Sequence, residues 1–146
     1  MSRLILLVLL LSSHVLTPSL SLADDCYRLV HAIWKQKPKR ILKALAKTPD
    51  VNCLPRKGYS KGPLHAAVFY ADVETVSLLL RNGADPNKLS ADGYPPIAFG
   101  NGTARFGRIF YGWGRPTEIW ETKMKRVRDL LDEAGADFNV TWKGSD

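Results

Sequence analysis

A five-residue segment occurs twice in this chain with one residue changed, and a shorter, weaker copy occurs a third time. Gly83-Ala84-Asp85-Pro86-Asn87 returns as Gly135-Ala136-Asp137-Phe138-Asn139, and the weaker copy is Pro49-Asp50-Val51-Asn52. The aspartates of the three copies lie 35 and then 52 residues apart. Such recurrence is typical of a solenoid, in which each unit is too small to bury its apolar face alone and stacks on its neighbours. The longer second interval indicates that the last unit contains an insertion.

A second pattern lies between these copies. Gly62-Pro63-Leu64-His65-Ala66-Ala67 has a degenerate echo in Gly93-Tyr94-Pro95-Pro96-Ile97-Ala98. With both patterns the chain resembles the ankyrin repeat family, whose first helix opens with T-P-L-H-x-A and whose second helix runs into a G-A-D-x-N turn. Residues Leu64 to Asn87 align with the family pattern without a gap, and the resemblance covers about Cys26 to Val140.

The resemblance implies an all-α fold, a short ankyrin-repeat solenoid. We expect about three helix-turn-helix units, at about 25–60, 61–93 and 94–140. In this family the histidine after Pro-Leu bonds backbone near the turn, so His65 is expected to be structural. The first and third units depart from the pattern, with Thr48 at the place of the turn glycine and with Pro95 and Ala98 at the places of Thr and His.

Apolar spacing and helix punctuation predict the helices within these units. Pro63 suits a first turn, where its missing N–H would have no intrahelical partner. A helix is expected near Val73–Arg81, stopped by Gly83, and another is expected to start near Thr117. In the first unit, Gln36 and Lys37 fall in the turn between two helices, and Pro38 opens the second of them. The apolar residues that indicate these helices are Tyr27, Val30, Ile33, Trp34, Ile41, Leu42, Leu45, Val76, Leu79, Leu80, Val127, Leu130, Leu131 and Ala134. Those from Val76 onward are expected to form one buried stripe on each helix.

The N-terminal residues have the pattern of a secretory signal peptide. Arg3 precedes an apolar run from Leu4 to Leu11, and Ser21-Leu22-Ala23 supplies small residues for cleavage. The run is less than half of the roughly 20 residues that span a bilayer, so we expect secretion without a membrane anchor. Residues 1–23 are therefore predicted to be removed, leaving residues 24–146 with 20 Lys and Arg against 14 Asp and Glu.

Two cysteines, Cys26 and Cys53, remain after that cleavage. In an oxidising compartment an isolated pair favours a disulfide, with two buried free thiols as the alternative. Closing this loop would stabilise the folded chain by about 3 kcal/mol in the chain-entropy model. Two cysteines and two histidines at unrelated spacings do not predict a metal site.

The insertion, at about residues 99–117, is rich in glycine, aromatic residues and arginine. Loops outside a scaffold commonly carry function, and aromatic residues and arginine dominate many interfaces. We expect it to bind a partner; alternatively, its aromatic rings cap the third unit and its arginines keep the chain soluble. The predicted binding residues are Arg105, Phe106, Arg108, Phe110, Tyr111, Trp113 and Arg115.

A second basic stretch lies in the first helical pair. It contains Lys35, Lys37, Lys39, Arg40, Lys43 and Lys47. This pattern indicates either a solvated face or an electrostatic surface that speeds the capture of an acidic protein.

No motif predicts catalysis, a cofactor or nucleic-acid binding. Ser60 and Ser77 have no histidine at an indicative spacing, and Asp50, Asp85 and Asp137 belong to the repeated turns. The glycines of the insertion match neither the P-loop nor the dinucleotide fingerprint. We therefore expect no enzyme.

These features together predict a non-catalytic protein-binding module with one acidic partner in the bacterial periplasm. Small signal-bearing ankyrin proteins of this kind resemble the immunity proteins that neutralise antibacterial type VI secretion effectors, especially phospholipases. Two alternatives stay open. One is a periplasmic ankyrin protein that supports oxidative-stress defence or organises an envelope complex, and the other is a secreted effector that binds a host protein.

Overall fold

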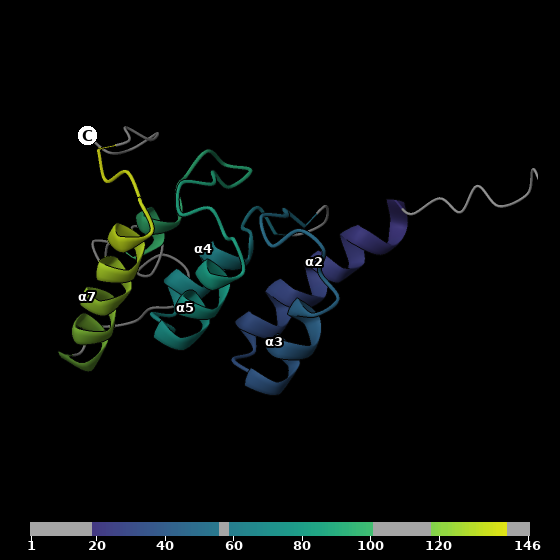
Figure 1. Cartoon of the computed structure of the whole chain (residues 1–146), viewed down its shortest axis with the longest axis horizontal. Coiled ribbons are helices and arrows are strands. Elements are labelled where there is room, and N and C mark those ends of the chain that lie inside the picture. Colours follow the sequence, from purple (N-terminus) through teal and green to yellow (C-terminus); the bar gives the residue numbers. More distant parts are fainter. Residues whose placement is uncertain (1–18, 56–58, 101–117, 140–146) are drawn as a thin grey trace, which may run out of the picture.

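The computed structural model describes residues 19–55, 59–100 and 118–139. Within these ranges it has helices and no strands, which agrees with the predicted all-α class. The elements are α2 (Ser19–Trp34), α3 (Pro38–Leu45), α4 (Pro63–Phe69), α5 (Val73–Arg81), the short 3-10 helix η1 (Pro96–Phe99) and α7 (Glu118–Glu133). The helices stand in a row, with the α2–α3 pair at one end, α4 and α5 in the middle and α7 at the other end (Figure 1).

Local chemistry sets several helix boundaries where the sequence predicts them. Pro38 and Pro63 occupy the first turns of α3 and α4. The Asp72 carboxylate caps α5 by accepting from the backbone N–H of Thr75 at 3.0 Å. Gly83 follows α5 with φ at +84°, a conformation that glycine adopts without a Cβ clash. The predicted helix near Val73–Arg81 is therefore confirmed.

The core runs along the row because each helical layer packs against the next. Helix α2 contacts α3 and α4, α4 contacts α5 and η1, and α5 contacts α7. The α4 residues from Pro63 to Val68 are all buried, as expected for an inner helix covered on both sides. The largest fully buried apolar side chains of the α-helices are Leu29, Val30, Ile33, Pro63, Val68, Val76, Leu79, Val127 and Leu131.

Side-chain amides of the repeated turns tie one layer to the next. Asn52 donates from Nδ2 to the Gly83 carbonyl at 3.0 Å, and its Oδ1 accepts from the Asp85 N–H at 2.7 Å. Asn87 makes the same two hydrogen bonds to the following turn's glycine and aspartate, at 2.9 and 2.7 Å. The recurring aspartate also accepts from the asparagine two residues later in each turn. Hydrogen bonds thus join the three repeated turns into one continuous row.

Not every apolar side chain at helical spacing is buried, and the expected burial of Ala134 is wrong. Leu42 is 57% exposed and Tyr27 is 40% exposed. Ala134 is also exposed, because α7 ends at Glu133. Conversely, Phe99, which stands at the start of the predicted insertion, is buried with its ring edge-on to His65.

Helix α2 begins at Ser19, upstream of the predicted cleavage point after Ala23. None of the helices in the three described ranges has the length and apolar character needed to span a membrane.

Candidate functional site

The predicted binding residues of the insertion lie outside the residues that the structure describes. They are Arg105, Phe106, Arg108, Phe110, Tyr111, Trp113 and Arg115. Two aromatic residues that flank them are described: Phe99 is buried and Trp120 is partly buried against the core. Gly100 is also packed closely, since a Cβ there would lie 2.6 Å from Met124 Sδ. The described residues at the two ends of the predicted insertion are therefore part of the packed scaffold.

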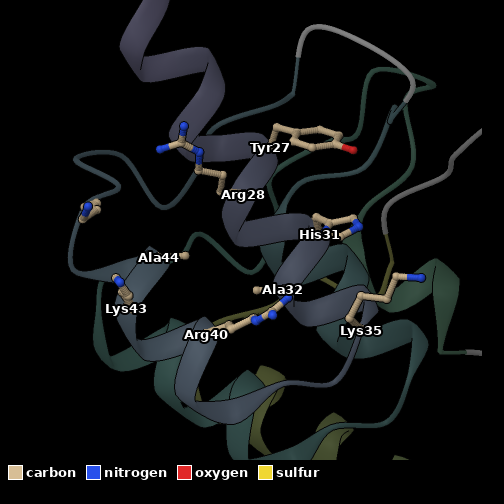
Figure 2. A pocket seen from close by; sticks show the side chains of 9 residues that line it. Tyr27, Arg28, His31, Ala32, Lys35, Arg40, Lys43 and Ala44 are labelled. Atoms are coloured by element: carbon tan, nitrogen blue, oxygen red, sulfur yellow. The ribbon is translucent and has the colours of Figure 1, made fainter.

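A groove lined by basic side chains lies between α2 and α3. Its volume is about 370 Å³, and Figure 2 shows side chains from both helices around it. Helix α2 contributes Tyr27, Arg28, His31, Ala32 and Lys35, while α3 and the turn after it contribute Arg40, Lys43, Ala44 and Lys47. We call this set the basic groove.

Helical spacing explains how the basic groove forms. On α2, Arg28, Ala32 and Lys35 are four and three residues apart, so they share one side of the helix. On α3, Arg40 and Lys43 are three residues apart and share one side of that helix, and Lys47 lies in the turn that follows it. The methyl groups of Ala32 and Ala44 leave space where larger side chains would fill the contact between the helices. The result is a hollow with small apolar residues at its base and cations along both sides.

The cations of the basic groove have little compensating charge. Arg28 pairs with Asp25, with 3.5 Å between Nη1 and Oδ1. Within the described part of the chain, no carboxylate lies within ion-pair distance of Lys35, Arg40, Lys43 or Lys47. Their like charges repel one another, so a bound anion would relieve an unfavourable interaction.

An aromatic cluster adjoins the basic groove and was missed by the sequence analysis. The Trp34 ring lies 5.4 Å from that of Tyr59, 6.3 Å from that of Phe69 and 6.0 Å from that of Tyr70, measured between centroids. Tyr27 continues the cluster, 5.5 Å from Tyr59. These rings join α2 to α4, and Tyr27 belongs to both the cluster and the groove. The 35-residue interval from Trp34 to Phe69 equals that between Asp50 and Asp85, and this was the signal available in the sequence.

His65 is structural, as expected from its place in the motif. Its ring is buried, and Nε2–H donates to the Tyr94 carbonyl at 3.1 Å. Burial lowers the pKa of His65 from 6.5 to about 4, so the imidazole is neutral at pH 7. The neutral ring, through its hydrogen bond to a backbone carbonyl, stabilises the turn before η1.

Cys26 and Cys53 are joined by a disulfide, the pairing that the sequence favoured. Their Cα atoms lie 6.0 Å apart, and the bond connects α2 to the loop after α3. Cys26 is buried on the core side of α2, next to Tyr27 in sequence. The bond therefore fixes one side of the basic groove to the adjoining turn.

Among the described residues, no group of three or more His, Cys, Asp and Glu side chains is arranged to hold a metal ion.

Comparison with known proteins identifies part of this scaffold. Residues 61–91 match the ankyrin repeat family model. This stretch contains α4, α5 and the Gly83–Asn87 turn.

The oxysterol-binding protein-related protein 1 of Rattus norvegicus is 40% identical to this chain over 55 residues. Those residues are 38% of this chain and 6% of the rat protein, so the chain corresponds to a small part of that relative. Ankyrin repeats are generally non-catalytic protein-interaction modules, and the resemblance is confirmed for residues 61–91.

Proposed function

We propose that this chain is a non-catalytic module that binds one acidic protein partner, built from about three ankyrin-type units. The observation that carries the proposal is the ankyrin match at residues 61–91, in which the turn is bonded to its neighbours on both sides through Asn52 and Asn87. Stacked units of this kind present a rigid surface, which suits recognition of another protein.

We further propose that the chain is exported to the periplasm, with removal of residues 1–23, and acts as an immunity protein against a toxic antibacterial effector. The signal-like N-terminus supports export. The Cys26–Cys53 bond supports an oxidising compartment, because disulfides persist there and are rare in the cytosol. The exposed cations of the basic groove support an acidic partner.

Affinity capture followed by a protection assay tests this proposal. The chain with its native N-terminus and a C-terminal tag is expressed in its source cells and purified from the periplasmic fraction. We expect one protein to co-purify in a fixed ratio, and co-expression to restore growth of cells that export this protein. A matched chain lacking residues 1–23 should give no protection, because it would stay on the wrong side of the membrane. The immunity role is excluded if the exported chain binds no toxin of its own genome and relieves none.

A further inference from the structure

We propose that the basic groove is the docking site for an acidic segment of the protein partner, whose Asp and Glu side chains lie between the cations of α2 and those of α3. This inference deepens the proposed protein-binding function and rests on it. It adds a contact at the end of the row of helices to the one that the sequence predicts for the insertion.

The position of the basic groove leaves it accessible. On α2, Tyr27, Arg28 and Lys35 lie on the side opposite the buried Leu29 and Ile33, as their helical spacing requires. Because the α2–α3 pair is at one end of the row, its outer side carries no further helix among the described elements (Figure 1). The core and the disulfide fix the groove from behind, so a partner would meet a preformed surface.

The distribution of charge along the chain identifies the groove's ligand as an anion. Residues 24–48 hold seven Lys and Arg against two Asp, whereas residues 49–146 hold thirteen Lys and Arg against twelve Asp and Glu. Nearly all of the excess positive charge therefore belongs to the first helical pair. Five of its seven cations line the basic groove. This concentration would attract an acidic partner and orient it during encounter.

The layout of these cations favours a peptide over a small anion. Arg28 and Lys35 are seven residues apart on α2, which is about 10 Å along the helix axis. Arg40 and Lys47 are separated by the same number of residues. Compact phosphate sites converge several donors on one point, often backbone N–H groups at a helix N-terminus. Here the donors are side chains in two lines, which matches carboxylates distributed along a segment of several residues.

The test measures binding of a defined probe by fluorescence anisotropy. The probe is a fluorescein-labelled ten-residue peptide that alternates Glu and Ala, and its control replaces every Glu with Gln. The protein is the chain expressed with its own N-terminus and purified from the cells. Two double variants are compared: Lys43→Gln/Lys47→Gln removes charge from the basic groove, and Lys37→Gln/Lys39→Gln removes the same charge nearby, from exposed positions that do not line it.

We expect the Glu probe to bind and the Gln probe to bind at least tenfold more weakly. The groove variant should weaken Glu-probe binding by about tenfold, because each exposed charge pair contributes up to about fivefold. The control variant should change it less than twofold. Equal losses in the two variants, equal binding of the two probes, or no binding of the Glu probe would overturn the inference. So would tighter, equally groove-dependent binding of pyrophosphate or of vesicles containing phosphatidylglycerol.

Capture of the natural partner separates this inference from the proposed function. If the groove variant captures the partner as well as the wild type does, the docking site is wrong and the protein-binding function stands. If the wild type captures no partner while the Glu probe still discriminates between the variants, the proposed function fails and the groove keeps its ligand chemistry.

Discussion

Mild acid is expected to destabilise this protein through His65. The side chain is 1% exposed, and Nδ1 has no hydrogen-bond partner among the described residues. Burial disfavours the imidazolium form, which lowers the pKa of His65 from 6.5 to about 4. The unfolded chain therefore takes up a proton on this residue at a higher pH than the folded chain does. The stability that the neutral ring provides is fully present above pH 6.5 and is lost as the pH falls towards 4.

The size of the effect follows from the pKa difference. A difference of about 2.5 pH units corresponds to about 3 kcal/mol of unfolding free energy when the loss is complete. At pH 5 the unfolded chain is almost fully protonated at this position and the folded chain is mostly neutral, so about 2 kcal/mol should already be lost. That is a large share of the stability of a small domain.

Urea unfolding followed by circular dichroism measures this loss. Wild type and His65→Gln are compared at pH 7.5 and pH 5, in the same salt. The Gln variant is less stable throughout, but it lacks the titrating group, so its loss on acidification reports the carboxylates and the other histidines. We expect the wild type to lose about 2 kcal/mol more than the variant between the two pH values. Equal losses would refute the assignment of a depressed pKa to His65.

Three further perturbations test other parts of the scaffold. Asn87→Ala removes two hydrogen bonds between neighbouring turns and should lower the unfolding free energy by about 1–3 kcal/mol, measured by urea titration. Cys26→Ser/Cys53→Ser should cost about 3 kcal/mol in the chain-entropy model, and mass spectrometry of the unreduced wild type should show two hydrogens fewer than the dithiol. Deletion of residues 102–114 should preserve helical content and cooperative unfolding while weakening partner capture; an unfolded deletion variant would show that the segment is structural.

Much of the scaffold could be predicted because its signals are local. Pro38 and Pro63 mark helix starts, and Gly83 supplies the positive φ that ends α5; each requirement is met within a few residues of sequence. The burial pattern depends on contacts between helices as well. Leu42 follows the apolar spacing of α3, yet it is exposed because only one face of that helix meets α2. The spacing of apolar residues shows which side of a helix is apolar. It does not show how much of that side the neighbouring helix covers. The three unit boundaries and the cleavage after Ala23 stay predictions.

The candidate site was predicted only in part, because it depends on two helices meeting. The sequence shows a basic stretch from Lys35 to Lys47, and four of its six cations line the basic groove. Arg28 and Tyr27 were left out because they precede that stretch, although α2 brings them to the same hollow. The contact between the rings of Trp34 and Phe69 was likewise not predicted. Their contact follows from stacking one helical unit on the next, which a single-helix pattern does not describe.

A comparison between α3 and α7 argues against solubility as the whole reason for the basic groove. Both helices lie at ends of the described row and have an exposed side. Helix α7 carries charges of both signs, and Lys125 and Arg126 lie 3.3 and 3.7 Å from the carboxylates of Asp129 and Glu133. Such interspersed charge keeps a surface soluble with little repulsion. Helix α3 contains cations and no carboxylate, and its cations face those of α2 across the hollow. This arrangement places like charges that repel one another on one face. An acidic ligand that binds there explains the arrangement better than solubility does.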